Sequence, residues 1–406
     1  MTTRVSVSSS GEQGNAPSES GPLSAGGRFE AFLSEASNLV PGDTNGASDV
    51  FVRNRRSGVT RRVSVSSSGE QADGVSGRPS ISAGGRFVAF PDDASNLVPG
   101  DTNNDFDAFV RDRWTGTTTR VSVSSSGTQG NGASGTPSIS SNGRFVAFAS
   151  GASNLVPGDT NGASDVFVRD RWRGCTRRVS VSSSGRQGNV SSLSPAISAN
   201  GRFVAFVSDA KFVAGDTNGF HDVFVRDRWS GTTTRVTASS IGGQGGGTSP
   251  AISADGRFVA FFAYDTSQLV AGDDNLADDA FVRDRSTGTT TRISVSPSGE
   301  QGNGSSGQGG SPSVSEDGRY VAFDSYASNL VPGDTNGYSD TFVRDLWTQT
   351  TTRISVTSAG AQGNGLSFGP YVSANGRVVA FFSYASNLVS GDMNATNDVF
   401  VRGPLS

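Results

Sequence analysis

Acidic and amide side chains recur in this chain at a fixed spacing that suits a cation. An Asp-x-Asn-x-x-x-Asp pattern occurs seven times. Oxygen ligands at alternate positions, followed by a later carboxylate, resemble the first half of a Ca²⁺-binding loop. The pattern lacks the terminal glutamate of such loops, so backbone carbonyls and waters would have to complete the shell. The candidate ligands are Asp43, Asn45, Asp49, Asp101, Asn103, Asp107, Asp159, Asn161, Asp165, Asp216, Asn218, Asp222, Asp273, Asn275, Asp279, Asp334, Asn336, Asp340, Asp392, Asn394 and Asp398.

The same pattern has a second interpretation that needs no metal. Asp and Asn side chains accept hydrogen bonds from nearby backbone N–H groups and so pin a long loop in an Asx-turn. The three positions persist although the residues between them have changed, from Gly-Ala-Ser after Asn45 to Leu-Ala-Asp after Asn275. That contrast indicates a role for these side chains, and both roles remain open at this point. Ca²⁺ is the one cofactor that the sequence suggests.

Other candidate groups point less clearly to chemistry. His221 is the only histidine, so a Ser-His-Asp triad would have to use it, and it stands at a variable loop position. Cys175 is the only cysteine, which excludes an intramolecular disulfide and a Cys/His zinc cluster. Seven glutamines share one loop position, and we expect each to fasten its own loop. They are Gln13, Gln71, Gln129, Gln187, Gln244, Gln301 and Gln362.

These groups belong to an internal repeat that fills the chain. A Gly-Arg-Phe-(Val)-Ala-Phe marker precedes each acidic pattern, and the intervals between its arginines are 58, 58, 58, 55, 62 and 58 residues. Seven repeats of this size account for all 406 residues. A fixed period of this length is typical of solenoids and propellers. The arginines are Arg28, Arg86, Arg144, Arg202, Arg257, Arg319 and Arg377.

Each repeat predicts four short antiparallel strands. In the third repeat we expect strands at residues 137–140, 144–149, 165–171 and 177–182. Asn142-Gly143 is a strong signal for a tight hairpin between the first two. The connections after the second and fourth strands are long and polar, and both lie on one rim, where function usually resides.

Seven four-stranded units without helical periodicity predict an all-β, seven-bladed propeller formed by one domain of residues 1–406. An open β-solenoid is the alternative. The chain begins with an isolated fourth strand around Val5 and Val7 and ends after a third strand around Val399 and Val401. We therefore expect the N-terminal strand to complete the last blade and close the ring. Since the chain starts inside a repeat, it could be an excised, natural or designed sequence.

The segment Ser253 to Phe261, Ser-Ala-Asp-Gly-Arg-Phe-Val-Ala-Phe, resembles the first hairpin of TolB-like, WD-repeat-like propellers. The likeness covers that hairpin in every repeat, whereas the long loop after the second strand departs from it. The resemblance implies a propeller. The family includes periplasmic proteins that bind partners and the gating propellers of serine peptidases, which favours an exported location.

Composition limits the partners. The formal net charge is −4, so no basic excess indicates nucleic acid, and no apolar run is long enough for a membrane helix. No signal peptide is present in the sequence. We expect a monomer whose long-loop rim receives a protein or glycan ligand.

The seven repeats are nearly identical, and this similarity is the basis of our prediction of function. No titratable group stands out in a single repeat, and catalysis usually needs such asymmetry. We therefore expect a non-catalytic binding or scaffold propeller, with Ca²⁺ loops on one rim. Two alternatives remain: a lectin-like propeller with one sugar site per blade, and an enzyme with a blade-specific site near the central channel. For the latter, Asp273, Asp274, Asp278 and Asp279 are the most acidic group.

Overall fold

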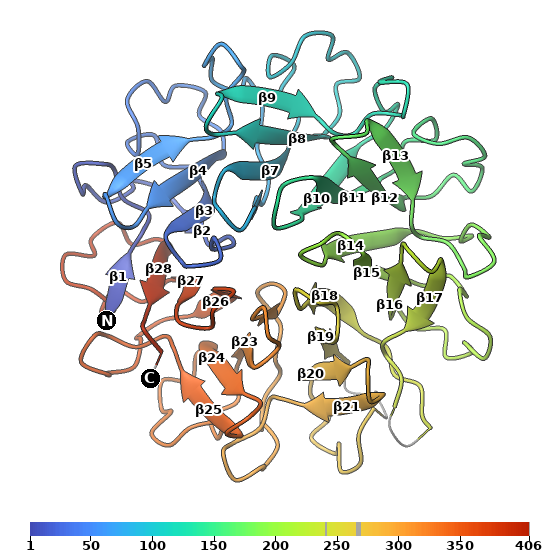
Figure 1. Cartoon of the computed structure of the whole chain (residues 1–406). Helices are drawn as coiled ribbons and strands as arrows, with labels where there is room; N and C mark the ends of the chain where they lie inside the picture. The colour runs from blue at the N-terminus through green and yellow to red at the C-terminus, as the bar shows by residue number, and fades with distance from the viewer. Residues whose placement is uncertain (240–241, 265–268, 406) are drawn as a thin grey trace.

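Seven antiparallel sheets of four strands each form the blades of a ring (Figure 1). The computed structural model describes residues 1–239, 242–264 and 269–405. Within these ranges the chain contains no helix, and so none that could cross a membrane. The predicted all-β, seven-bladed propeller is confirmed.

The strands follow the repeat in chain order, with the innermost strand of each blade first. Blade 1 is β2 (Ser18–Glu19), β3 (Phe29–Ser34), β4 (Asp49–Asn54) and β5 (Val59–Arg62); blade 2 is β6 (Ser80–Ile81), β7 (Phe87–Asp92), β8 (Asp107–Asp112) and β9 (Thr117–Arg120). Blade 3 is β10 (Ser134–Ile139), β11 (Phe145–Ser150), β12 (Asp165–Asp170) and β13 (Cys175–Arg178); blade 4 is β14 (Ser192–Ile197), β15 (Phe203–Ser208), β16 (Asp222–Asp227) and β17 (Thr232–Arg235). Blade 5 is β18 (Thr248–Ile252), β19 (Phe258–Ala263), β20 (Asp279–Asp284) and β21 (Thr289–Arg292); blade 6 is β22 (Ser313–Val314), β23 (Tyr320–Ser325), β24 (Asp340–Asp345) and β25 (Thr350–Arg353). Blade 7 is β26 (Ser367–Val372), β27 (Val379–Ser383), β28 (Asp398–Arg402) and β1 (Thr2–Arg4).

The inner strand is longer than predicted and contains a bulge. In blade 3 it begins at Ser134, and its register with β11 shifts between Gly135 and Ser138. The hairpin that follows is the predicted tight turn, with Gly143 at a φ of 73°. This left-handed conformation suits glycine, which has no Cβ. The same register shift occurs in blades 4, 5 and 7, where it inserts one extra residue into the inner strand.

The outer strand is displaced from its predicted position. β13 covers Cys175–Arg178, whereas the alternating pattern had predicted residues 177–182. The Ser180 hydroxyl accepts a hydrogen bond from Val166 N and donates one to Asp165 Oδ1 at 2.5 Å. A side chain therefore replaces the backbone ladder there, and Val179 and Val181 are buried outside the sheet.

The hydrophobic core lies between neighbouring blades. One cluster packs Val110 and Val121 of blade 2 against Phe148, Leu155 and others of blade 3. Phe148 pairs with Phe167 across β11 and β12, with ring centroids 5.9 Å apart, and both side chains are fully buried. Each blade thus depends on the next one for its core.

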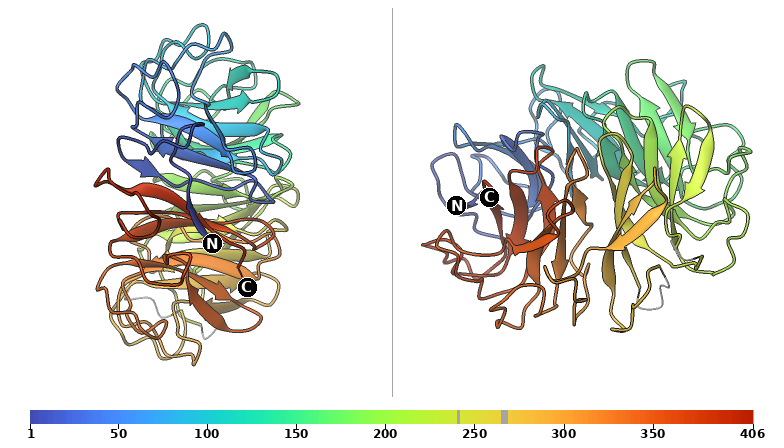
Figure 2. Two further views of the ribbon diagram at one scale, coloured as in Figure 1. Left: turned by 90° about the vertical axis from the view of Figure 1, so that its left-hand side faces the viewer. Right: turned by 60° about the horizontal axis from the view of Figure 1, so that its bottom comes forward.

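The N-terminal strand closes the ring as predicted. β1 pairs with β28 in the register Thr3↔Val401, and Val5 N donates to Val399 O at 2.7 Å. The two chain ends lie beside each other, since the amino group of Met1 donates to Gly403 O at 3.0 Å (Figure 2). Closure removes the open edge that blade 7 would otherwise present.

Candidate functional site

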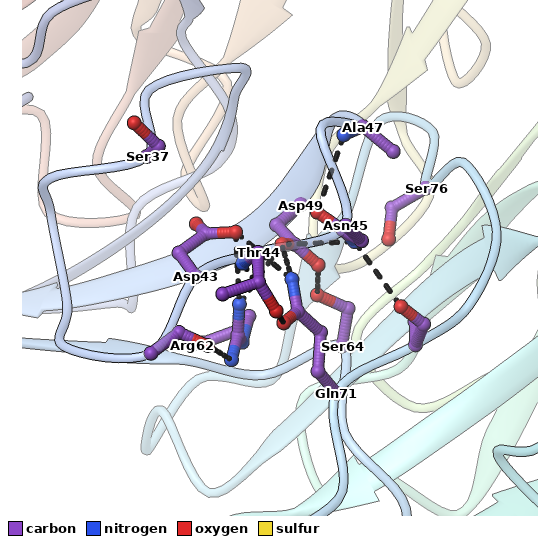
Figure 3. Close-up of polar contacts among 12 residues, drawn as sticks. Ser37, Asp43, Thr44, Asn45, Ala47, Asp49, Arg62, Ser64, Gln71 and Ser76 are labelled. Atoms are coloured by element: carbon purple, nitrogen blue, oxygen red, sulfur yellow. Dashed lines mark hydrogen bonds and ion pairs between the residues drawn. The ribbon is translucent and has the colours of Figure 1, made fainter.

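An arginine stands between the two aspartates of each acidic pattern. In blade 1, Arg62 Nη1 lies 3.1 Å from Asp43 Oδ1 and 3.2 Å from Asp49 Oδ2 (Figure 3). Asp49 is fully buried, and its Oδ1 accepts a 2.5 Å hydrogen bond from Ser64. Burial raises the pKa of Asp49, while Ser64 and Arg62 oppose that rise. The guanidinium supplies the positive charge between these two carboxylates.

The asparagine of the pattern forms a turn. Asn45 Oδ1 accepts a hydrogen bond from Ala47 N at 3.2 Å, and its Nδ2 donates to Ala72 O at 3.1 Å (Figure 3). The equivalent contacts of Asn161 reach Ala163 N at 3.0 Å and Gly188 O at 3.1 Å. The carbonyl oxygen that a metal would need therefore binds the loop's own backbone, as in an Asx-turn.

The repeated glutamine completes the network. Gln71 Nε2 donates to Asp43 Oδ1 at 2.9 Å and to Asp49 Oδ2 at 3.3 Å. Gln13, Gln129 and Gln187 donate in the same way to both aspartates of their loops. These glutamines fasten loops, as expected. The arginines equivalent to Arg62 are Arg4, Arg120, Arg178, Arg235, Arg292 and Arg353.

Three blades depart from this arrangement. In blade 6, Gln362 Nε2 donates to Thr335 Oγ1 at 2.9 Å, and its Oε1 accepts a hydrogen bond from Arg353 at 2.9 Å. In blade 4, Arg235 Nη1 lies 3.5 Å from Asp216 and 3.7 Å from Asp222, and Asp222 Oδ2 has no hydrogen-bond partner among the described residues. Burial raises the pKa of Asp222 to about 7. In blade 5, Gln301 donates to Asp274. Burial and the neighbouring Asp279 raise the pKa of Asp273 to about 6.

Each predicted ligand set is therefore brought together, around a guanidinium. Among the residues that the structure describes, no group of three or more His, Cys, Asp or Glu side chains could hold a metal ion. A Ca²⁺ ion at these loops would have to displace the arginine from between the carboxylates. Ca²⁺ binding stays a prediction, and its test is given in the Discussion.

The remaining sequence candidates lie on opposite rims. His221 Nδ1 contacts Asp209 Oδ1 on the rim of the long loops, and both side chains are about half exposed. Beside them, a groove of about 720 Å³ is lined by Lys211, Arg186 and Gln187 among others. On the rim of the tight turns, Trp114 is 73% exposed, and Arg86 lies 4.8 Å from its ring centroid. The tryptophan therefore packs on an arginine.

An ion pair and a phenol lie near one another at the centre of the ring: Arg78 pairs with Glu19, and Tyr371 is within electrostatic range of both. Sequence reasoning missed these three side chains. Arg78 Nε lies 2.9 Å from Glu19 Oε2, and both side chains are well exposed. Arg78 of blade 2 also reaches blade 6, since a Cβ on Gly310 would lie 3.6 Å from its Nη1. Burial raises the pKa of the Tyr371 phenol; Arg78 opposes that rise and Glu19 adds to it. The cluster joins the inner strands of blades 1, 2 and 7.

Each member of this axial cluster (Glu19, Arg78 and Tyr371) is specific to its blade. The strand pairing places Ser20, Thr136, Ser194, Ser249 and Gly369 where blade 2 has Arg78. It places Ser80, Ser138, Ala196, Ala251 and Ser313 where blade 7 has Tyr371. In the sequence, Arg78 and Tyr371 stand at positions where the compared repeats have small residues. This difference is the signal that could have indicated the cluster.

Three buried carboxyl groups also break the symmetry. Glu30, Asp92 and Asp324 are fully buried. Burial raises the pKa of Glu30 strongly, that of Asp92 to about 6 and that of Asp324 to about 7. Other repeats have valine where blade 1 has Glu30, and Leu33, Ala149 and Val207 stand where blade 6 has Asp324. The premise that no titratable group stands out in one repeat is therefore wrong.

Comparison with solved structures agrees with the fold. An oligogalacturonate lyase in complex with manganese has a TM-score of 0.60 at 11% identity, covering 100% of this chain and 93% of that one. A prolyl endopeptidase gives 0.56 at 11% identity, covering 97% of this chain and 51% of that one. TolB from Acinetobacter baumannii gives 0.46 at 14% identity, covering 83% of this chain and only 63% of that one. No family model and no curated protein matches the sequence.

The chain is a seven-bladed propeller in its fold, like these solved structures. At these identities the likeness concerns architecture alone. The architecture nonetheless overturns the predicted restriction to a non-catalytic binding or scaffold module, because propellers of this kind occur in a lyase and in prolyl endopeptidase and acylaminoacyl peptidase structures. The restriction rested on the symmetry of the repeats, and the axial cluster and the buried carboxyls break that symmetry. A protein or glycan partner on the long-loop rim stays a prediction.

Proposed function

We propose that the chain is an enzyme that acts on a carboxylate-bearing substrate at the axial cluster. The observation that supports this proposal is the Glu19–Arg78 ion pair, with the Tyr371 phenol in electrostatic range, brought together from three blades at positions where most other repeats have uncharged residues. An acid, a base and a fixed cation are the groups that proton abstraction beside a carboxylate requires. A repeat built only for packing needs none of them there.

Arg78 is the group that would recognise the substrate. Its guanidinium is well exposed and is held by Glu19 at 2.9 Å. A substrate carboxylate can take two parallel hydrogen bonds from a guanidinium and so compete with Glu19 for it. Glu19 would then be released as the general base beside the bound substrate.

The reaction class that fits these roles is β-elimination. Glu19 takes the proton from the carbon next to the substrate carboxylate, a carbon–carbon double bond forms, and the bond from the adjacent carbon to the leaving oxygen breaks. Tyr371 donates its proton to that oxygen, since a phenol is protonated at neutral pH. The step is balanced without an oxidant or reductant. A uronate-containing oligosaccharide is the substrate class, suggested by the structurally similar oligogalacturonate lyase.

The test compares the parent protein with substitutions that copy other blades. Arg78→Ser introduces the residue found at Ser194 and Ser249, so the strand should fold normally. We expect the parent to convert oligogalacturonate to an unsaturated product, measured by its ultraviolet absorbance, and Arg78→Ser to lose at least about a hundredfold in kcat/KM. Glu19→Gly, which copies Gly77, should lower kcat.

The control is Arg186→Thr on the long-loop rim, which copies Thr128 and should leave the rate unchanged. An inactive parent across a panel of uronate oligosaccharides would refute the substrate class. An active parent with a fully active Arg78→Ser variant would refute the site.

A further inference from the structure

A groove between blades 3 and 4 gathers arginines on the rim of the tight turns, away from the long loops. It has a volume of about 430 Å³, within the range of small-molecule sites. We call it the blade 3–blade 4 groove. It is lined by Asn142, Arg144, Phe145, Val168, Asp170, Arg173, Cys175, Arg177, Asn200, Arg228 and Trp229.

The charges of this groove do not balance. Four arginines and one aspartate line it, which gives a net charge of +3. Asp170 is already engaged by Arg144, with Nε–Oδ1 and Nη2–Oδ2 distances of 2.9 and 2.7 Å. Among the described residues, no ion pair joins Arg173, Arg177 or Arg228 to a carboxylate. Three guanidinium groups of the groove therefore lack an ion-pair partner, although Asp170 attracts Arg228 and Gly201 O accepts a hydrogen bond from it.

The position of Arg228 intensifies this imbalance. Its guanidinium lies 4.5 Å from the centroid of Phe145, and Arg144 lies 4.7 Å from the same centroid. Burial lowers the pKa of Arg228 to about 10, and repulsion from Arg177 and Arg144 contributes to the decrease. An anion bound among these groups would relieve the repulsion.

The fold itself does not require Arg173 and Arg177, whereas arginines equivalent to Arg228 recur as Arg55, Arg113, Arg171 and Arg285. Blade 2 has Thr115 and Thr119 where blade 3 has Arg173 and Arg177. The equivalent groove between blades 5 and 6 is lined by Thr287, Thr291 and Leu346 among others, and Asp284 is its only charged residue. The same scaffold is thus cationic between blades 3 and 4 and weakly acidic between blades 5 and 6.

An exposed aromatic ring borders the cationic groove. Trp229 is 68% exposed, and Arg202 lies 4.9 Å from its centroid. Arg202 is itself fixed by Asp227 at 2.7 Å, so the ring is held in place. An exposed indole face can stack against a sugar or a planar ring.

We propose that the blade 3–blade 4 groove binds a small ligand that carries a phosphate or sulfate group. The oxyanion lies among Arg173, Arg177 and Arg228, and a ring attached to it stacks on Trp229. Arginine suits such groups because its planar fork matches their oxygens. This site is separate from the axial cluster and does not depend on the proposed enzymatic activity.

Cys175 provides a direct readout of occupancy. It is the only cysteine in the chain, is partly exposed and lines the groove. The experiment measures its alkylation rate by a small neutral thiol reagent at constant ionic strength. Inorganic phosphate, inorganic sulfate and glucose 6-phosphate are titrated separately against chloride. We expect saturable protection of at least about fivefold, with the sugar phosphate effective at a lower concentration than inorganic phosphate.

The decisive variant is Arg173→Thr/Arg177→Thr, which copies blade 2 and should keep the parent's melting temperature. Because these substitutions also change the thiol's own reactivity, each protein is compared with and without ligand. Protection should be lost in the double variant and retained in Arg186→Thr. Trp229→Ser, which copies Ser286, should remove only the advantage of the sugar phosphate. No saturable protection in the parent, or equal protection in the double variant, would overturn the proposal.

Discussion

At the scale of single residues, two equally buried aspartates differ in the groups around them: Asp49 has a cation and hydrogen-bond donors, whereas Asp324 forms no ion pair among the described residues. Asp49 is buried but faces Arg62, Ser64 and Gln71, so its charge is compensated. Asp324 is equally buried, and its Oδ1 has no hydrogen-bond partner among the described residues. Its Oδ2 accepts a hydrogen bond from the backbone N–H of Gly309 at 3.3 Å, and neighbouring backbone N–H groups oppose the rise of its pKa without cancelling the effect of burial. A carboxyl group in such a place is stable mainly when it is protonated.

This difference predicts a pH effect on stability. Burial raises the pKa of Asp324 from 3.8 to about 7 in the folded protein. Between these values the folded state holds a proton that the unfolded state has lost, so stability should fall as the pH rises through this window. Asp324→Asn should remove this part of the fall, and above pH 7 the variant should exceed the parent by on the order of a few kcal/mol.

The measurement is urea denaturation of parent and variant at several pH values. Glu316→Gln, at an exposed turn, serves as the control and should follow the parent. Parallel curves for the parent and Asp324→Asn would contradict the assignment.

The acidic loops give a second prediction at this scale. Arg178 Nη1 lies 3.1 Å from Asp159 and 3.0 Å from Asp165, and its removal would leave two carboxylates without a cation. We expect Arg178→Ala to lower the melting temperature, and millimolar Ca²⁺ to restore part of the loss, because a divalent ion can then enter between the carboxylates. Calorimetric titration of both proteins, with excess chelator as the reference, measures the effect.

In the parent, Ca²⁺ must compete with the guanidinium, so its binding should be weaker than in the variant. If neither protein shows heat of binding, the Ca²⁺ prediction is wrong. The aspartates and asparagines then only form the Asx-turns and the ion pairs with arginine.

At the scale of elements, the inner strand explains what could be predicted and what could not. The spacing of Gly-Arg-Phe predicts the hairpin and strands such as β11 and β12, because tight turns and apolar runs are local signals. The bulge is not a local signal. It extends β10 back to Ser134, whereas the inner strand of blade 2 is only Ser80–Ile81, and Arg78 precedes it. In the sequence, Arg78 looks like a surface residue in a polar loop.

The axial cluster could not be predicted from the sequence because its residues come from different blades. Glu19, Arg78 and Tyr371 are separated by up to hundreds of residues and meet only when blades 1, 2 and 7 surround one axis. The acidic pattern was found because its members are close in sequence. Its arginine was missed because Arg62 comes from the next strand of the blade.

The second strand of blade 1 contains a buried glutamate that should destabilise the protein. Glu30 is fully buried in β3, and neither of its carboxyl oxygens has a hydrogen-bond partner among the described residues. Burial raises its pKa strongly although Arg55 and Arg53 oppose the rise. Every other repeat has a buried valine there. Glu30→Val should raise the free energy of unfolding by about 1–3 kcal/mol, since an unsatisfied polar group is replaced by an apolar one.

Thermal denaturation at neutral pH measures this gain. The reverse change, Val88→Glu, is the matched control and should destabilise blade 2. A lower melting temperature for Glu30→Val would mean that the carboxyl group is satisfied in solution.

At the scale of the whole molecule, blade 7 depends on both ends of the chain. Arg4 lies 3.4 Å from Asp392 and 3.3 Å from Asp398, and Ser6 donates to Asp398 Oδ1 at 2.5 Å. The N-terminal segment thus supplies a strand and the charge that neutralises two buried aspartates. In the other blades the arginine and the serine follow in the same repeat.

Deleting residues 1–10 should therefore lower the melting temperature clearly and promote self-association. The loss exposes the edge of β28 and leaves Asp398 buried without its cation. Differential scanning calorimetry and light scattering measure the two effects. Arg4→Ala, which keeps the strand, separates the contribution of the charge. A monomeric deletion variant with the parent's melting temperature would contradict closure by this route.

The pairing of β1 with β28 has a consequence for biosynthesis. Arg4 is synthesised almost 400 residues before Phe400, its partner in the finished ring. At about 5–20 residues per second, the delay is roughly 20–80 seconds. During that time the nascent segment carries Val5 and Val7 without the neighbours that later bury them. Six blades can mature in order as they emerge, whereas the seventh cannot finish until translation has passed its last strand. Strand β1 is thus synthesised before the other strands of all seven blades but can be fixed only when β28 has emerged.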